Sequence, residues 1–174
     1  MNILKEYNIA FSGLSLGNHS FEFDLDDRFF ECFEGSEIAH GRFHVEMELE
    51  KKERLLNFNF HFEGTVRVAC DRCAEEFDMP LEGDDHLLVK FGDETSEMDD
   101  DIMVLHHEET KLDVSGYIYD MISVMIPFRK IHPEKEDGTS GCDPDMLDRI
   151  ESMQIPTQTD PRWDKLMGLL DNEN

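Results

Sequence analysis

Four cysteines, at positions 32, 70, 73 and 142, are the residues of this chain best suited to chemistry. Two of them lie in "ACDRC", where two residues separate Cys70 from Cys73. This is the spacing of a zinc knuckle, in which a tight turn lets both sulfurs reach one ion. Redox pairs and ordinary turns share the same spacing. The pair by itself therefore leaves three interpretations open.

A tetrahedral metal site needs two further ligands, and the sequence offers them far along the chain. Cys142 lies in a Gly-rich loop, "GTSGCDPD", that can fold back, and His132 precedes it by ten residues. We therefore predict a structural zinc site whose ligands are Cys70, Cys73, His132 and Cys142. The separation of the two halves is not that of a common zinc finger. A metal-free turn with an exposed loop thiol is the alternative.

A redox role for the cysteine pair is less well supported. Such a role favours a C-x-x-C at the start of a helix, where the helix dipole lowers the pKa of one thiol. Here the pair follows a predicted strand, and the next residues, "AEEFDMP", are too few and too acidic for that helix. Cys32, in "FFECF", is expected to be an ordinary buried thiol.

No other catalytic signature emerges from the sequence. It contains no G-x-S-x-G, P-loop, G-x-G-x-x-G or H-E-x-x-H motif. His106 and His107 are adjacent, so on a strand they would point to opposite faces and could not easily share an ion. Carboxylates are so abundant that no pair stands out as an acid–base couple. We therefore expect a protein that is not an enzyme and has no small-molecule substrate.

The charge of the chain restricts its partners. Lys and Arg number 16 against 41 Asp and Glu, which gives a net charge of −25. Such a surface repels phosphate backbones and attracts basic proteins and cations. Extensive nucleic-acid binding is disfavoured, although a small basic patch could exist. The candidates for that patch lie near the predicted zinc site: Arg67, Arg72, Arg129 and Lys130.

The sequence predicts a cytoplasmic protein that does not enter a membrane. Its N-terminus lacks the long apolar run of a signal peptide. No window approaches the 18 or so apolar residues of a membrane span. Thiols stay reduced in the cytoplasm, so a cysteine pair is there more often a metal or redox site than a disulfide.

Alternating apolar and polar residues predict antiparallel strands over 19–26, 42–50 and 55–70. Gly64 marks a bend or bulge in the third of them. If that strand is continuous, Cys70 points inward or lies at the rim of the sheet. The inner face of this strand would carry four large apolar side chains, Leu56, Phe58, Phe60 and Phe62.

The second half of the chain mixes strands, loops and helices. A strand is predicted around 86–91 and a short edge strand over 102–107. Between them, 93–101 holds six acids and no base, which predicts a solvated loop. Apolar residues at helical spacing predict a helix over 113–125, which would pack on the sheet. A short helix is predicted over 145–152.

The last residues predict a linker followed by an amphipathic helix. Asp160 is a suitable N-cap with Pro161 at the first helical position. This tail would dock on the sheet or bind a partner, and the partner-binding candidates are Asp160, Pro161, Arg162, Trp163 and Leu166.

Together these elements predict an α+β fold: an antiparallel sheet, or a partly closed barrel, covered by one helix, with a C-terminal amphipathic helix. Residues 1–152 would form one domain that carries the C-x-x-C. Residues 153–174 would form the linker and the C-terminal helix, a segment that could be mobile.

Four features in this order resemble the YceD family of large ribosomal RNA subunit accumulation proteins. A strand ends in C-x-R-C with Phe77 four residues on; a helix runs into "MIPFRKIH"; Cys142 follows; and "DPRWDKLMGLL" closes the chain. The resemblance covers roughly 55–170. It departs from the family pattern at "MIPFRKIH", which holds one proline where the family has two.

The resemblance implies a role in accumulation of 23S ribosomal RNA, and hence in biogenesis of the large ribosomal subunit. It supplies no catalytic residues. Combined with the charge, it favours a factor whose acidic strand faces and 93–101 loop bind a basic ribosomal protein. The alternatives are direct binding of 23S ribosomal RNA through the basic patch near the C-x-x-C, and a zinc or redox enzyme.

Overall fold

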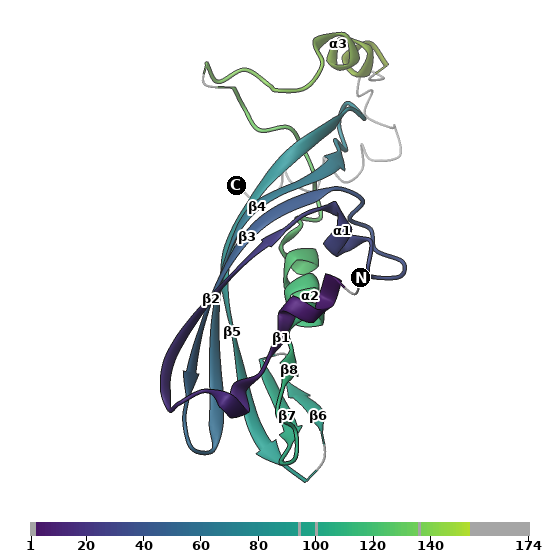
Figure 1. Ribbon diagram of the computed structural model, residues 1–174. Coiled ribbons are helices and arrows are strands. Elements are labelled where there is room, and N and C mark those ends of the chain that lie inside the picture. Colours follow the sequence, from purple (N-terminus) through teal and green to yellow (C-terminus); the bar gives the residue numbers. More distant parts are fainter. Residues whose placement is uncertain (1–2, 94, 100, 136, 154–174) are drawn as a thin grey trace, which may run out of the picture.

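A curved six-stranded sheet dominates the computed structural model, which describes residues 3–93, 95–99, 101–135 and 137–153, with backbone alone for 96–99 (Figure 1). In spatial order its strands are β2 (Gly17–Leu25), β3 (Gly41–Lys51), β4 (Leu55–Ala69), β5 (Glu76–Gly92), β7 (Ile102–His106) and β6 (Ser96–Asp99). Strands β2 to β5 are antiparallel in succession, β7 runs parallel to β5, and β6 is antiparallel to β7. The α+β prediction is confirmed.

The sheet is open, so of the two predicted arrangements the barrel is wrong. Within the described ranges its edge strands β2 and β6 do not pair with each other. The sheet is also mixed, because β7 enters parallel to β5. β7 lies between β5 and β6 and is therefore not the predicted edge strand. Part of the 93–101 segment, predicted as a loop, forms β6.

The concave side of the sheet is covered by helix α2 (Ser115–Met125), near the small β1 (Asn8–Ile9) and β8 (Leu112–Asp113) pair (Figure 1). Ile118 and Ile122 of α2 are completely buried, as their helical spacing predicts. The other helices of the described residues are η1 (Ile3–Tyr7), η2 (Phe11–Gly13), α1 (Asp27–Phe30) and α3 (Pro144–Met153). In the part of the chain that the structure describes, no helix has the length and apolarity to cross a membrane.

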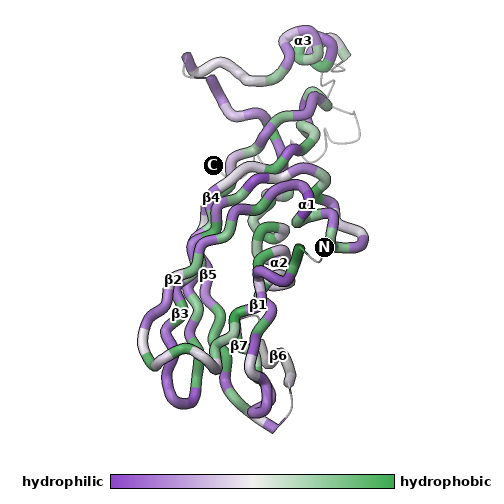
Figure 2. The backbone as a smooth tube through the Cα atoms, in the orientation of Figure 1, coloured by the Kyte–Doolittle hydropathy of each residue, from purple (hydrophilic) through white to green (hydrophobic). Residues whose placement is uncertain are grey.

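Hydrophobic and hydrophilic residues alternate along the strands (Figure 2), and burial shows that this alternation separates a core face from an outer face. Eight large inward side chains of β3 and β4 are buried; they are Phe43, Val45, Met47, Leu49, Leu56, Phe58, Phe60 and Phe62. Burial of this apolar surface supplies most of the driving force for the sheet. The intervening residues face the solvent, and on these strands many of them are acidic.

The β4–β5 hairpin projects beyond the rest of the sheet. Strand β3 pairs with β4 only as far as Val66, whereas β4 and β5 continue to pair until Ala69 meets Glu76. The predicted 86–91 strand is too short, because β5 already begins at Glu76 and continues through Pro80 and Gly83. Pro80 is tolerated here since β7 joins β5 only from Leu88 onward, so at Pro80 the strand has a neighbour on one side alone.

Candidate metal centre

The turn that connects β4 to β5 carries Cys70 and Cys73. The N–H of Ala74 donates to the carbonyl of Cys70 at 2.9 Å, and the N–H of Cys70 donates to the carbonyl of Glu75 at 2.8 Å. Ala74 adopts a left-handed conformation with φ of 62°, which is uncommon outside glycine. These constraints close a tight knuckle, and both thiols in it are buried.

The segment after α2 folds back on itself and brings His132 next to Cys142. Glu134 and Ser140 form an antiparallel bridge, and the N–H of Lys135 donates to the carbonyl of Thr139 at 2.8 Å. A turn at Gly138, with φ of 78°, reverses the chain between them. This short hairpin explains how two ligands ten residues apart reach the same point.

Gly141 permits the close approach on which this loop depends. A Cβ atom at position 141 would lie 2.4 Å from the carbonyl oxygen of Pro133 and 3.0 Å from the Cβ of His132. The first distance is far inside van der Waals contact and involves backbone, so a larger residue requires the loop to open. The need for glycine beside Cys142 could not be foreseen without knowing that residues 133 and 141 meet.

The loop is fastened to the knuckle by Asp71, the residue after the first cysteine of the pair. Its N–H donates to the carbonyl of Lys130 and its carboxylate accepts from the N–H of Lys130, both at 2.7 Å. Nearby, the ring of His132 stacks on Phe77 with the ring centres 4.3 Å apart. Asp71 is a positioning residue that the sequence alone did not single out, whereas Phe77 was already part of the C-x-R-C feature that resembles the family.

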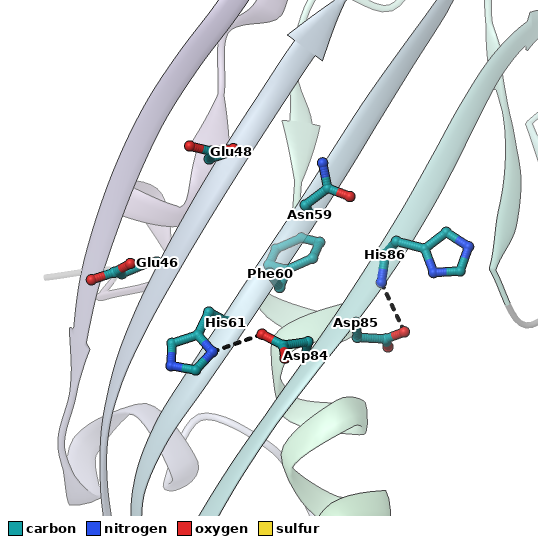
Figure 3. A pocket seen from close by; sticks show the side chains of 8 residues that line it. All are labelled: Glu46, Glu48, Asn59, Phe60, His61, Asp84, Asp85 and His86. Carbon is teal, nitrogen blue, oxygen red and sulfur yellow. Dashed lines mark hydrogen bonds and ion pairs between the residues drawn. The ribbon is translucent and has the colours of Figure 1, made fainter.

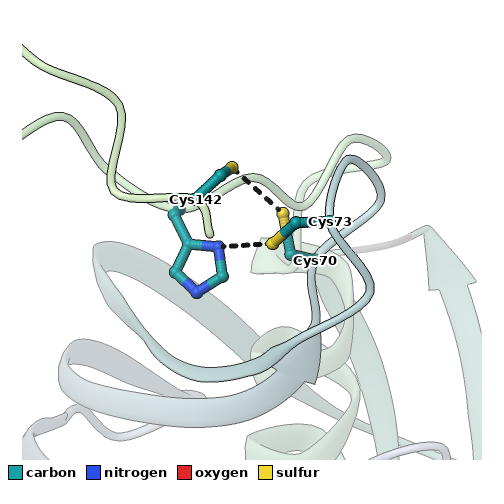
Figure 4. Close-up of side chains that lie close together, drawn as sticks. Cys70, Cys73 and Cys142 are labelled. Carbon is teal, nitrogen blue, oxygen red and sulfur yellow. Dashed lines mark hydrogen bonds between the residues drawn. The ribbon is translucent and has the colours of Figure 1, made fainter. Parts of the chain in front are cut away.

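The four predicted metal ligands converge. The sulfurs of Cys70 and Cys142 are 3.7 Å apart, and the sulfur of Cys73 is 3.4 Å from Nδ1 of His132 (Figure 4). All four ligand atoms lie within 4.8 Å of one another. A tetrahedral zinc ion with ordinary bond lengths requires edges of about 3.8 Å between sulfurs and about 3.6 Å between sulfur and nitrogen. The cluster therefore has the dimensions to hold a metal such as zinc.

The sulfurs in this cluster are thiols and not disulfides, because a disulfide bond is only about 2.05 Å long. Burial raises the pKa of Cys142. At Cys70 burial also acts to raise the pKa, but backbone donation from Cys73 and Arg72 and hydrogen bonds from His132 outweigh it and lower the pKa to about 6. A thiolate is the form that coordinates zinc, so these donors favour ligation. Cys32, predicted to be buried, is exposed.

Three of the four predicted basic residues gather around the knuckle. Arg72 follows Asp71, and the pairing of Asp71 with Lys130 brings Arg129 into the same region. Arg72 and Arg129 are exposed. Arg67 differs, because its guanidinium binds both carboxylate oxygens of Asp78 at 2.9 and 3.1 Å and its charge is neutralised there.

A second candidate surface is the outer face of strands β2 to β5, which we call the acidic sheet face. Cross-strand register sets its side chains in two rows, the first Asp24, His44, Glu63 and Glu82, the second Glu22, Glu46, His61 and Asp84. A shallow pocket of about 440 Å³ opens in this face between β3, β4 and β5 (Figure 3). It is lined by Glu46, Glu48, Asn59, Phe60, His61, Asp84, Asp85 and His86.

Two histidines, His44 and His61, interrupt the acids of the two rows. Nδ1 of His44 is 2.8 Å from a carboxylate oxygen of Asp24, and Nδ1 of His61 is 2.7 Å from one of Asp84. These hydrogen bonds are the largest cause of a raised pKa in both histidines. Alternation predicted that these residues face the solvent, but which of them lie side by side depends on strand register. The predicted partner-binding residues, Asp160, Pro161, Arg162, Trp163 and Leu166, lie outside the described residues.

Comparison with known proteins gave one family. Residues 58–170 match the family model described as large ribosomal RNA subunit accumulation protein YceD. The matched segment contains the knuckle, helix α2 and the loop that supplies His132 and Cys142. No curated protein and no solved structure matched the chain.

Proposed function

The chain belongs to the YceD family, and we propose that it acts as a binding factor whose acidic sheet face holds a basic ribosomal protein during large-subunit assembly. Family membership implies a role in accumulation of the large ribosomal RNA. A chain with a net charge of −25 is poorly suited to coat that RNA, because its field repels phosphates. A basic ribosomal protein is the assembly component whose charge complements this surface.

The observation that carries the proposal is the placement of like charges opposite each other. Glu22 lies directly across from Glu46, and Glu63 across from Glu82. Side chains at such positions have Cβ atoms about 4.5–5.5 Å apart, and like charges there destabilise a sheet. Within the described ranges Glu22, Glu63 and Glu82 have no ion-pair partner. A lysine- or arginine-rich partner would relieve this repulsion on binding.

The same electrostatics would accelerate the encounter. Complementary charge raises association rates and lowers the affinity of wrong partners, and both effects weaken with salt. The factor would shield the basic protein until ribosomal RNA replaces it. Since RNA carries a denser negative charge than this face, transfer to the RNA is favoured without a chemical step.

In this proposal the Cys3His centre is a structural zinc site. Each of the four positions of a tetrahedron is supplied by the chain, whereas catalytic zinc keeps one position for water or substrate. The ion would join the β4–β5 turn to the loop after α2, segments far apart in sequence. The closed ligand set also counts against a zinc enzyme.

The test is a charge-matched pair of variants. Glu22, Glu46, Glu63 and Glu82 are each changed to Gln in one protein. The control changes four exposed acids elsewhere, Glu31, Glu34, Glu37 and Glu53, to Gln. Affinity for purified basic proteins of the large subunit is measured by titration at several salt concentrations.

The face variant should bind at least ten-fold more weakly than the control, since both lose the same net charge and only one loses it at the site. Its melting temperature should rise, because the opposed glutamates no longer repel. Equal weakening in the two variants would show a non-specific charge effect and contradict the proposal.

A further inference from the structure

We propose that the chain has a second binding surface, at the tip of the molecule, that holds single-stranded RNA by stacking a base on Phe128. This surface, the tip patch, consists of Phe128, Arg129, Lys130 and Arg72. It is distinct from the acidic sheet face and does not depend on the protein partner proposed for that face.

The exposure of Phe128 is the first observation. Its side chain has a relative accessibility of 103%, the highest among the large apolar residues of the described part of the chain. Val124, in the last turn of α2, is also exposed, at 78%. A lone exposed hydrophobic residue is ordinary, so exposure alone would not indicate a site. The restrained backbone and the cationic neighbours of Phe128 are what indicate a binding site.

The backbone holds Phe128 in the solvent. Helix α2 ends at Met125, and Pro127 fixes its own φ angle directly before Phe128. Two residues later, Lys130 is bound to Asp71 through two hydrogen bonds of 2.7 Å. The short segment that carries the exposed ring therefore has little backbone freedom on either side of Phe128.

Three cationic residues lie near Phe128 along the chain or through the Asp71–Lys130 contact, in a molecule that is otherwise strongly acidic. Arg129 and Lys130 follow Phe128 directly, and Arg72 lies next to the Asp71 that pairs with Lys130. None of these three cations forms an ion pair with another described residue. Their charge is therefore available to a ligand, unlike that of Arg67.

An exposed aromatic ring bordered by free guanidinium and ammonium groups is the combination that binds unpaired nucleotides. The ring stacks on a base, and the cations contact the neighbouring phosphates. An apolar groove of a protein partner would leave these three cations unmatched, whereas the phosphates of a nucleic acid would pair with them. A duplex hides its bases from the ring, so the patch should select single strands.

The size of the patch limits the binding. Three cations can neutralise about three phosphates, and each contributes about −0.7 to the log–log dependence of affinity on salt. The slope should therefore be no steeper than about −2. With a basic protein on the acidic sheet face and an unpaired RNA segment at the tip, one molecule could hold both components at once.

The experiment measures binding of a fluorescent 12-nucleotide oligouridine to the full-length protein by anisotropy. Phe128→Leu keeps an apolar side chain but removes the ring, and should weaken binding about ten-fold. Phe128→Tyr keeps the ring and should bind like the wild type. Neither change should alter the melting temperature, because the side chain is exposed.

Charge variants separate the contribution of the cations. Arg72→Gln and Arg129→Gln should each reduce the magnitude of the salt slope by about 0.7. Lys111→Gln, an exposed cation elsewhere, should leave the slope unchanged.

Three results would overturn the inference: no binding of the oligouridine, equal affinity of wild type and Phe128→Leu, or equal affinity for a duplex of the same length. A fourth, Phe128→Leu weakening capture of a ribosomal protein but not of RNA, would identify the tip as a protein anchor instead. Removing the four glutamates of the acidic sheet face should not weaken RNA binding, so the two proposals fail independently.

Discussion

The tip of the β4–β5 hairpin and the outer face of the same strands differ in how their polar groups are paired. At the tip the polar groups meet one another: sulfurs and an imidazole nitrogen converge within 4.8 Å, and Asp71 binds the backbone of Lys130. On the outer face, glutamates stand opposite glutamates. The contacts at the tip therefore hold the fold together from within, whereas the face carries repulsion that a basic partner would relieve.

The two regions also differ in the sequence separation of the contacts that build them. The tip joins residues that are 72 positions apart, so its integrity depends on a non-local contact. The face is built from successive antiparallel strands whose pairing is already secured by the buried side. Damage to the tip should reduce stability, and damage to the face should change binding with stability kept or improved.

Removing one ligand of the tip should have the largest effect. Cys142→Ser is expected to abolish a zinc content of about one ion per chain and to lower the free energy of unfolding by at least ~3 kcal/mol, because the metal then no longer closes the contact between the two segments. Elemental analysis and thermal unfolding, with and without a chelator, measure both quantities.

The control for that experiment is Cys32→Ser, because Cys32 is exposed and its thiol donates a hydrogen bond to the carbonyl of Arg28 at 3.2 Å, away from the metal centre. It should keep both the metal and the stability. If the wild type contains no zinc and a chelator leaves its melting temperature unchanged, the centre is a packed thiol cluster. The tip would then not stabilise the fold through a metal.

A smaller loss is expected when the approach of the loop is blocked without touching a ligand. In Gly141→Ala the new Cβ would lie 2.4 Å from the carbonyl oxygen of Pro133, so the loop must move. We expect the free energy of unfolding to fall by ~1–3 kcal/mol, with weaker zinc retention in a chelator titration. Gly116→Ala is the matched control, since nothing lies within 4 Å of its Cβ position and alanine favours the helix there. Equal behaviour of the two variants would show that the tip tolerates an open loop.

The sequence predicted well those features that depend on residue type and local period. Alternation identified β2, β3 and β4, and the helical stripe identified α2. The types and spacing of Cys70 and Cys73, with a distant cysteine and histidine, were sufficient to propose the four ligands that the structure brings together. Zinc ligation requires few residue types, and this limits the alternatives.

Contacts between segments could not be predicted where the residue types carry no ligand chemistry. Gly141 is required because Pro133 lies against it, and Asp71 matters because Lys130 arrives beside it. The opposed glutamates follow from register, which alternation leaves undetermined. Cys32 was expected to be buried because its neighbours are apolar, but it follows the short helix α1 and points away from the core that Phe29 and Phe30 enter.

The smallest effect on stability should come from the histidines of the acidic sheet face. It tests whether protonation of these histidines changes the stability of the fold. Asp24 raises the pKa of His44 and Asp84 raises that of His61. An unfolded histidine has a pKa of about 6.5. The pairs therefore stabilise the fold fully below about pH 6.5, and this stabilisation is lost as pH rises through the higher folded pKa values.

The variant His44→Gln with His61→Gln should accordingly melt slightly below the wild type at pH 5.5 and at the same temperature at pH 8.5. The difference should be small, because both pairs are exposed and screened by salt. His107→Gln, an exposed histidine without an ion pair to a described residue, should show no such dependence. A difference that persists at pH 8.5 would mean that the imidazoles act by packing instead of charge.

The same protonation bears on the proposed partner. Each imidazolium adds a positive charge to the face, so a basic protein should bind the wild type more weakly at pH 5.5 than at pH 8.5, and the double variant should lose most of this dependence. Stability and affinity would then change in opposite directions with pH at one set of residues. Opposite pH dependences of stability and affinity are expected only if the partner binds by relieving the repulsion between the acidic side chains of this face.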